Sequence, residues 1–307
     1  MSSKVLILGT SGFLGKHVKS LLEKDSLDFV EIEGKNQVNL EKEDEIQNYL
    51  SQNSIDKIIN CSAFVGGISY GYKFPVEMLA TNTKMIINLY NAASKNEVKH
   101  IVNPISNCAY PGHLEVYKEE DFWEGPPHSS VFYYGLSRRN TVAVSNSFKQ
   151  QYSIDTSNIV LSNMYGPRDH FDIDRSHALG ALVKKVCDAK LNNENEIEVW
   201  GTGKPIREWL YVEDGARALI KSLELSEPHQ LFNVGINEGI SIKELSEKIS
   251  SEAEWDGKFR YNKSKPDGVK RKTVDGSLGE DLLQWSPEID MDSGIKMTVD
   301  WYVENNE

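Results

Sequence analysis

Short, continuously apolar runs alternate with longer segments of helical periodicity along the first half of the chain. The run at residues 4–9 (KVLILG) has the character of a strand buried on both faces, and Leu14, Val18 and Leu21 after it keep helical spacing. Such an alternation is typical of a doubly wound parallel sheet with right-handed crossovers. It predicts strands at 4–9, 28–32, 55–61, within 100–112 and at 153–161, and helices at 13–23, 41–51, 75–94 and 134–152.

Beyond residue 162 the pattern becomes less regular. Residues 163–177 are polar and turn-rich, as expected where a chain leaves a sheet, and residues 265–307 mix a charged loop with short helical segments. Ser241 stands three residues before Glu244, which is the spacing of a capping box at the start of a helix. Between these segments the pattern predicts an amphipathic stretch at 178–190, strands at 197–200 and 232–235, and helices at 213–225 and 241–250.

A glycine-rich turn joins the first predicted strand to the first predicted helix. Its sequence, GTSGFLG at residues 9–15, would let the backbone approach a pyrophosphate at the amino terminus of the helix, although a tight structural turn is the alternative. A dinucleotide-binding fold contacts the adenosine ribose roughly twenty residues further on. There Glu33 favours NAD, since it could accept from the 2'-hydroxyl, and Lys35 favours NADP, since it could bind the 2'-phosphate.

The length of 307 residues allows one large domain or two moderate ones with a shared core. We expect an α/β protein with a Rossmann-like doubly wound parallel sheet and a smaller α/β substrate-binding lobe. The dinucleotide-binding part would comprise residues 1–162 and 206–236, and the substrate-binding lobe would comprise residues 163–205 and 237–307.

Composition and charge narrow the classes of partner. A net charge of -12 disfavours extended contact with nucleic acid or an anionic membrane, because both need clustered cations. Three scattered cysteines are too few for a disulfide framework or a zinc site, so we expect no metal and a reducing, cytoplasmic setting. No apolar run is long enough for a signal peptide or a membrane span.

The first candidate for chemistry is the segment HIVNPISNCAYPG at residues 100–112. If the segment is extended, Ser106 and Cys108 project from the same side, about 7 Å apart. The carboxyl end of a central strand is where an open α/β sheet presents its ligand crevice. The alternative is that both residues are small side chains that fill the end of a strand.

The second candidate is the pair Tyr134 and Arg138, which are one helical turn apart on the same face. A fixed cation beside the phenol would lower the pKa of Tyr134 from its usual value towards neutrality. Tyr134 would then exchange a proton with a carbonyl or alcohol oxygen that Ser106 also binds, while a nicotinamide ring exchanges hydride with the carbon. An ordinary ion–aromatic pair on a helix surface is the alternative.

The order of motifs resembles the extended short-chain dehydrogenase/reductases and, among them, the GDP-L-fucose synthase family, over essentially the whole chain. The resemblance rests on GTSGFLG, SAFVGGI, SNCAYP, GPPHSS before YYGLSR, SNMYGPRDHF, RSHALGAL, VWGTGKPIREWLYVED and KPDGVKRK. It implies a bifunctional 3,5-epimerase and 4-reductase that converts GDP-4-keto-6-deoxy-D-mannose to GDP-L-fucose with NADPH. It also implies a homodimer that packs the helices at 75–94 and 134–152 against their mates.

The same resemblance implies roles for individual residues. In catalysis, Cys108 would be the base and His177 the acid of epimerisation, beside Ser106, Tyr134 and Arg138. NADP(H) would be bound by Gly9, Thr10, Ser11, Gly12, Phe13, Leu14, Gly15, Lys35, Asn39, Leu40, Ala63, Ile105, Tyr134, Arg138, Asn163 and His177. The GDP-sugar would be bound by Asn163, Lys185, Trp200, Arg207 and Asp267, with Lys185 and Arg207 at the diphosphate and Trp200 at the base.

Two departures leave alternatives open. Arg138 replaces the lysine of the family, and Ser11 stands where some relatives have an arginine that meets the 2'-phosphate. We expect an active enzyme with a slowed hydride step, and Lys35 keeps NADP the first choice. The alternatives are an NAD-dependent nucleotide-sugar 4-epimerase or dehydratase, an epimerase/reductase of a GDP-keto-heptose, and a nucleotide sensor without turnover.

Overall fold

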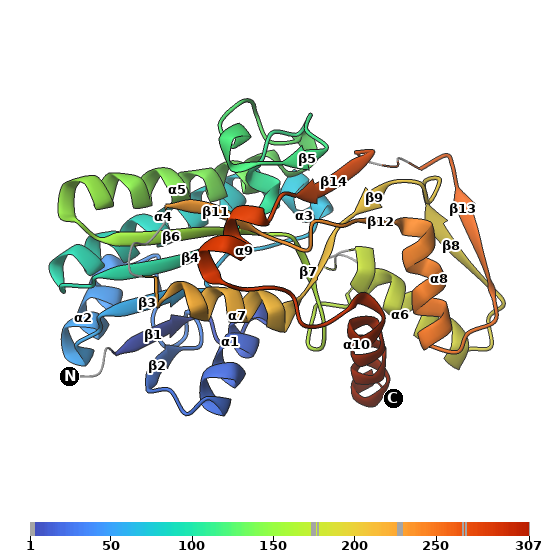
Figure 1. The fold of residues 1–307 in the computed structure, drawn as a ribbon, viewed down its shortest axis with the longest axis horizontal. Coiled ribbons are helices and arrows are strands. Elements are labelled where there is room, and N and C mark those ends of the chain that lie inside the picture. The colour runs from blue at the N-terminus through green and yellow to red at the C-terminus, as the bar shows by residue number, and fades with distance from the viewer. Residues whose placement is uncertain are drawn as a thin grey trace.

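The computed structural model describes residues 4–172, 176, 178–225, 230–265, 267 and 269–306. A large parallel sheet with helices on both faces lies beside a smaller lobe of short strands and helices, as Figure 1 shows. The first described strand, at residues 5–8, lies in the large sheet, and the last helix packs in the smaller lobe.

Six parallel strands form the large sheet, which confirms the predicted fold class. Its strands are apolar because both faces are covered: Leu6, Ile7 and Leu8 in the first strand are fully buried. In spatial order the strands are β11 (Leu231–Val234), β6 (Asp155–Leu161), β4 (His100–Ser106), β3 (Lys57–Asn60), β1 (Val5–Leu8) and β2 (Phe29–Ile32).

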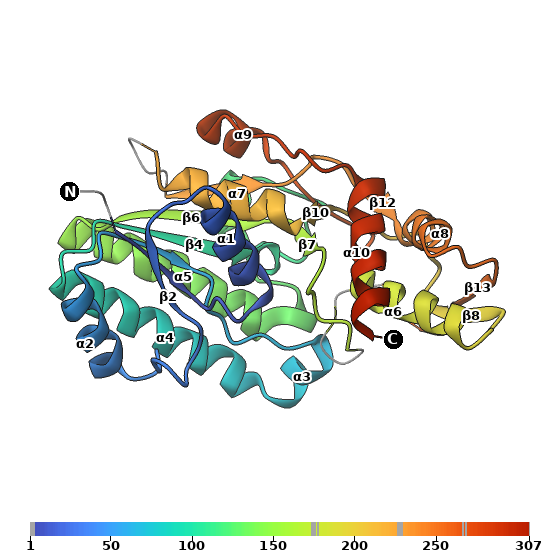
Figure 2. The same ribbon diagram turned by 90° about the horizontal axis from the view of Figure 1, so that it is seen from below.

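Two layers of helices cover this sheet, and Figure 2 shows them on opposite sides. On one face, side chains such as Ile86 and Leu89 pack against Leu6 and Ile101, and on the other face Val18 and Leu219 pack with Ile7. The first layer contains α2 (Glu43–Asn53), α4 (Pro75–Lys95) and α5 (Phe132–Tyr152); the second contains α1 (Phe13–Lys24), α7 (Val212–Ser222) and α9 (Ser277–Leu283).

The smaller lobe has its own apolar core, to which Val183, Val186, Ile249 and Ile295 contribute. The capping box predicted at Ser241 is present at the start of one of its helices. Its helices are α6 (Ala178–Leu191), α8 (Ile242–Glu252) and α10 (Met291–Asn306), and its two parallel strands are β8 (Glu196–Trp200) and β13 (Lys258–Asn262).

Short strands from distant parts of the chain meet between the two cores. A four-stranded sheet has the order β12 (Ile240–Ser241), β9 (Ile206–Arg207), β14 (Arg271–Val274) and β5 (Val116–Tyr117). A separate pair consists of β7 (Asn163–Tyr165) and β10 (Trp209–Tyr211). These strands bring residues of the second half of the chain beside the carboxyl end of β4.

Some elements differ from the sequence-based expectation. The expectation of only short helices in 265–307 was wrong, because α10 spans sixteen residues and buries Ile295, Val299 and Tyr302 at helical spacing. Helix α3 (Ile68–Lys73) was not predicted, since its sequence has glycine and aromatic residues without a helical apolar stripe. The division into two domains stays a prediction. Helix α9 lies in the range predicted for the smaller lobe, 237–307, but packs on the large sheet.

Among the residues that the structure describes, no helix combines the length and the apolar character needed to cross a membrane.

Candidate active site

A tight turn follows strand β4 and carries the first two candidate residues. The strand ends at Ser106, and residues Asn107–Ala109 form a 3-10 turn whose start is capped by Ser106, because its Oγ accepts a hydrogen bond from the Cys108 backbone N–H at 3.2 Å. The expectation that Ser106 and Cys108 project from the same side of one extended strand was therefore wrong, because Cys108 lies in the turn. Both side chains nevertheless line the same cavity.

Tyr134 reaches that cavity from the first turn of α5, which begins two residues earlier than predicted, at Phe132. Its phenol hydrogen-bonds the Ser106 side chain, and the Arg138 guanidinium carbon lies 5.6 Å from the ring centroid. The expected lowering of the Tyr134 pKa was wrong. Burial raises the pKa of Tyr134 above its usual value, and the Arg138 charge and the Ser106 hydrogen bond offset this only in part.

Arg138 is buried and connects α5 to the loop after β3. Its Nη2 donates to Asn82 Oδ1 at 2.9 Å, and the same oxygen accepts from the Phe64 backbone N–H at 2.9 Å. Asn82 also donates to the Phe64 carbonyl. Phe64 directly follows Ala63, one of the predicted cofactor residues, so Arg138 helps to fix this loop.

Helix α5 packs directly against the turn that holds Cys108. A Cβ at Gly135 would collide with the Cys108 carbonyl oxygen, so only glycine permits this close approach. One helical turn further on, Arg139 is buried, and its Nε donates to the Ala109 carbonyl at 2.6 Å. The Arg139 guanidinium carbon lies 5.7 Å from the ring centroid of Phe122, within cation–π range.

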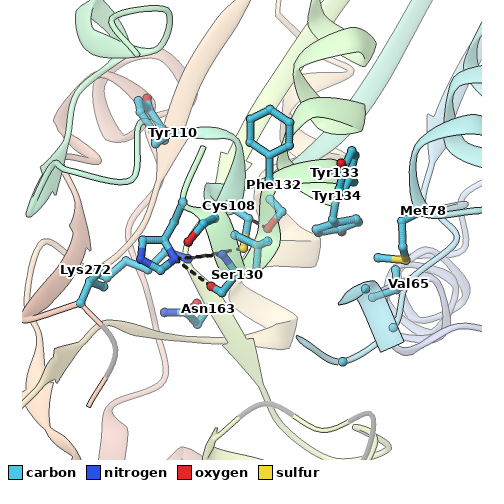
Figure 3. A pocket seen from close by; sticks show the side chains of 18 of the residues that line it. Val65, Met78, Cys108, Tyr110, Ser130, Phe132, Tyr133, Tyr134, Asn163 and Lys272 are labelled. Atoms are coloured by element: carbon cyan, nitrogen blue, oxygen red, sulfur yellow. Dashed lines mark hydrogen bonds between the residues drawn. The ribbon is translucent and has the colours of Figure 1, made fainter. Parts of the chain in front are cut away.

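The cavity has a volume of about 580 Å³. Figure 3 shows Cys108, Tyr134 and Asn163 reaching it from the turn after β4, from α5 and from β7, with Val65 and Met78 on another part of its wall. Of the predicted catalytic and substrate residues, it brings together Ser106, Cys108, Tyr134, Asn163 and Arg207. His177 lies outside the described residues.

Two polar side chains to which the sequence analysis gave no role, those of Lys272 and His128, also line the cavity. Lys272 on β14 places its Nζ 3.4 Å from Cys108 Sγ. His128 Nδ1 accepts from the Ser130 backbone N–H at 3.3 Å, so a neutral His128 carries its proton on Nε2. No sequence pattern reveals the Lys272 contact, because it depends on the pairing of β14 with strands far away in the chain.

The glycine turn has the geometry that a dinucleotide requires. Gly9 has φ +80°, where a side chain is strained, and a Cβ at Gly15 would collide with the Gly9 carbonyl, so α1 can lie directly on the turn. No side chain caps the amino terminus of α1 at Gly12, which leaves its first backbone N–H groups for a phosphate. These features fit the pyrophosphate of NAD(P).

The other predicted cofactor residues differ in what they contact. Thr10 Oγ1 donates to Glu31 Oε2 at 2.6 Å, and Ser11 Oγ donates to the Glu33 carbonyl at 2.7 Å. Leu14, Leu40 and Ile105 are core side chains, so they shape the site through packing and backbone. Phe13 packs edge-on against His17, Asn39 Oδ1 accepts from the Glu41 N–H, and Lys35 and Glu33 are exposed. Their cofactor roles stay predictions.

Three of the predicted nucleotide-binding residues do not line the cavity. Lys185 Nζ donates to the Glu198 carbonyl at 3.0 Å. Asp267 accepts from the Thr202 hydroxyl at 2.8 Å. Trp200 is 61% exposed, with the Lys265 ammonium 4.9 Å from its ring centroid. Their roles toward a GDP-sugar also stay predictions.

A buried carboxyl, Glu208, lies between the two cores. Its two oxygens accept from the backbone N–H groups of Ile236 and Val274, both at 2.6 Å, and its own carbonyl accepts from Asn163 Nδ2. Burial raises the pKa of Glu208 to about 7, although these two N–H groups favour the ionised form. Glu208 thus holds β9, β14 and the end of β11 around the cavity.

This shift predicts a pH-dependent stability. The pKa of Glu208 in the folded protein lies above that in the unfolded chain, so its contribution is complete below pH of about 4.5 and is lost as the pH rises through about 7. Relative to Glu208→Gln, the free energy of unfolding of the wild type should therefore fall by roughly 3 kcal/mol between about pH 4.5 and pH 8. Denaturant titrations followed by circular dichroism measure this difference. The exposed Glu124→Gln serves as control, and an equal pH dependence in all three proteins would contradict the assignment.

No group of three or more His, Cys, Asp or Glu side chains in the described part of the chain is arranged to hold a metal ion.

The chain is similar in sequence to known proteins. Residues 5–235 match the model of the NAD dependent epimerase/dehydratase family. The chain is 29% identical over 304 residues to a probable GDP-L-fucose synthase 1 of Oryza sativa subsp. japonica, covering 98% of this chain and 92% of the relative. It is 30% identical over 303 residues to the GDP-L-colitose synthase of Yersinia pseudotuberculosis, covering 98% of each.

A solved structure is also similar along the whole chain. The GDP-L-fucose synthetase of Naegleria fowleri bound to NADP superimposes with a TM-score of 0.88 and 26% identity, covering 99% of this chain and 95% of that one. The glycine turn, the parallel sheet and the paired Ser106 and Tyr134 all lie within the matched range. The chain therefore belongs to the NAD-dependent epimerase/dehydratase family.

Proposed function

We propose that the protein is a 3,5-epimerase and 4-reductase that converts GDP-4-keto-6-deoxy-D-mannose to GDP-L-fucose with NADPH. The observation that carries the proposal is the convergence of the Ser106–Tyr134 pair and the Cys108 thiol on one cavity. A reductase of a ketosugar needs only the first two groups. A thiol beside them supplies the base that inversion at carbon requires, so the set favours a bifunctional enzyme.

The epimerisation uses the acidity that a 4-ketone confers on the protons at C3 and C5. Cys108 removes such a proton, and the electron pair of the broken C–H bond moves to the C4 oxygen. The Ser106 and Tyr134 hydroxyl groups bind this oxygen. The resemblance assigns the return of a proton on the opposite face to His177. This makes one thiol responsible for both centres, because Cys61 and Cys187 do not line the cavity.

In the reduction, NADPH held at the glycine turn would supply the hydride for C4. Tyr134 donates the proton that the C4 oxygen then needs, and its raised pKa keeps the phenol protonated at neutral pH. Ser106 holds the oxygen next to Tyr134. Arg138 holds the loop that contains Ala63 and stands where the family has its lysine.

NADP(H) rather than NAD(H) is the proposed cofactor. Lys35 is exposed just after β2, where the 2'-phosphate of NADP would lie, and the relative of 26% identity was solved with NADP. Titration of the protein with NADPH and with NADH tests this choice. Tighter binding of NADH, with Glu33 on the ribose, would overturn it.

We also propose a homodimer that buries the outer faces of α4 and α5. Apolar side chains are exposed on both helices: Val76 is 70% exposed, Tyr133 45% and Ile87 38%. Such side chains near one another are typical of an interface. Light scattering tests the mass, and a monomer at micromolar concentration would contradict the dimer.

One experiment tests the activity. The protein is incubated in D2O with GDP-4-keto-6-deoxy-D-mannose and NADPH, and the product is examined by NMR. The proposal expects GDP-L-fucose with deuterium at C3 and C5. A reduced sugar without deuterium at either carbon would show a simple reductase, and protein that purifies with bound NAD and only inverts C4 would show a 4-epimerase. A GDP-keto-heptose, tested in parallel, should react more slowly.

Arg138→Lys tests the departure from the family. The Arg138 guanidinium contacts both Asn82 and the Tyr134 ring. Lysine is shorter and has a single ammonium group, so it cannot keep both contacts. The departure alone suggested a slowed hydride step, but these contacts accommodate the arginine, so we expect an unchanged or lower rate of NADPH oxidation for Arg138→Lys, with a loss of up to about tenfold. Arg138→Met should lose more than about a hundredfold because the cation is removed. A clear gain in rate for the lysine variant would show that the arginine slows the hydride step.

A further inference from the structure

Lys272 lies against the sulfur that the proposed function uses as a base. Its Nζ is 3.4 Å from Cys108 Sγ, and both side chains line the cavity. Figure 3 shows this contact as a dashed line between the two residues. A donor at this distance is within the range of a hydrogen bond to sulfur, so the contact is directed rather than incidental.

The backbone holds Lys272 in this place. Strand β14 is paired on both sides: Lys272 lies opposite Arg207 on β9, and Thr273 lies opposite Val116 on β5. The Lys272 carbonyl also accepts from the Glu208 backbone N–H at 3.2 Å. Cys108, on the other side of the contact, is fixed by the capped turn after β4. Two rigid elements from distant parts of the chain therefore meet at this pair.

The chemistry of the base explains what the contact between Lys272 and Cys108 could contribute to epimerisation. A thiol removes a proton from carbon only as the thiolate, and an ammonium group bonded to the sulfur compensates the negative charge of that form. In a partly desolvated cavity such compensation is worth more than in water. We propose that Lys272 is a catalytic residue of the epimerisation, whose ammonium group holds the Cys108 sulfur in its proton-accepting form. This inference rests on the proposed function.

The step balances without any further reagent. The C–H bond at C3 or C5 breaks and an S–H bond forms, while the electron pair moves into the enolate whose oxygen Ser106 and Tyr134 bind. Lys272 keeps its protons throughout. Before the second centre reacts, the sulfur must release its proton to water, which restores the ion pair.

A different role for Lys272 has a different signature. Arg207 is its neighbour on β9 and also lines the cavity, so the two cations together would suit the diphosphate of a nucleotide sugar. In that case Lys272 would affect the binding of substrate and not the sulfur of the substrate-free protein. Measurements without substrate therefore separate the two roles.

The first experiment is alkylation of the substrate-free protein with iodoacetamide at neutral pH, followed at each cysteine by mass spectrometry. Burial raises the pKa of Cys61 to about 12 and that of Cys187 to about 11, so both thiols should react slowly and serve as internal references. Lys272→Met should lower the alkylation rate of Cys108 about five- to tenfold, and Lys272→Arg should retain most of it.

Lys270→Met is the matched control. Lys270 lies just before β14, its side chain is 87% exposed, and its Nζ is 3.9 Å from Glu115, so its loss removes a charge near the same strand without touching the sulfur. Its alkylation rate should equal that of the wild type. An unchanged rate at Cys108 in Lys272→Met, or an equal fall in Lys270→Met, would overturn the inference.

The second experiment measures the exchange of C3 and C5 protons with D2O. Lys272→Met should slow this exchange about tenfold and should slow the oxidation of GDP-L-fucose by NADP+ less, because the oxidation needs Tyr134 and Ser106 but not Cys108. A raised KM with unchanged alkylation would assign Lys272 to the diphosphate. If the wild type shows no exchange, the proposed function fails and the catalytic role with it, while alkylation still decides whether the pair exists.

Discussion

Tyr134→Phe is expected to lower the rate of ketosugar reduction by about a hundredfold to ten-thousandfold, because the C4 oxygen loses its proton donor. The exchange of C3 and C5 protons with D2O should fall much less, since Cys108 is unchanged and Ser106 still binds the C4 oxygen. Rates of NADPH oxidation and NMR of the sugar measure the two steps separately. The matched control is Tyr152→Phe: its ring is 50% exposed, lies at the other end of the same helix and does not line the cavity.

The raised pKa of Tyr134 adds a pH dependence to this prediction. A phenol that stays protonated up to and beyond its usual value of 10 can act as an acid across the neutral range, so reduction should not change between about pH 6 and pH 9. The reverse oxidation needs the phenolate and should rise with pH over that range. Reduction that falls near neutral pH would mean that the bound cofactor lowers the Tyr134 pKa after all.

Cys108→Ala is expected to lower the exchange at C3 and C5 by at least about a hundredfold, because no other cysteine lines the cavity to remove these protons. The oxidation of GDP-L-fucose by NADP+ should remain within about threefold of the wild type. Deuterium incorporation followed by NMR, beside a spectrophotometric assay of the oxidation, gives both quantities.

Cys187→Ala is the control for this variant, since that thiol is buried in the core of the smaller lobe. It should leave both rates unchanged. If Cys108→Ala kept its exchange, another group would have to be the base, and His128, which lines the same cavity, would be the next residue to replace.

The alternation of apolar runs and helical segments was enough to predict the large sheet, because strands that are buried on both faces are continuously apolar and therefore easy to recognise in the sequence. Leu6, Ile7 and Leu8 illustrate this, and so does the glycine turn that follows them. The predicted site residues Ser106, Cys108 and Tyr134 also line one cavity, since the carboxyl end of β4 and the start of α5 are adjacent in this fold.

What the sequence did not predict depends on contacts between distant segments. The 3-10 turn at Asn107–Ala109 has only three residues, too few for a periodic pattern, so its capping by Ser106 was not visible. The pKa of Tyr134 is set by burial, which no spacing reports. Lys272 approaches Cys108 only because two-residue strands pair across the chain, and strands this short leave no periodic pattern.

The missing side chain at Gly135 ties two chemical steps together. At Gly135, α5 lies directly on the carbonyl oxygen of Cys108, and Arg139 donates to the carbonyl of the following residue, Ala109. The helix that carries Tyr134, the proton donor of the reduction, is therefore fixed to the turn that carries Cys108, the base of the epimerisation. Cys108 therefore cannot be moved by a change at this contact without also moving Tyr134, so inversion and hydride transfer cannot be altered separately there. Adjustment could come instead through β14, whose Lys272 side chain contacts Cys108 from a separate sheet.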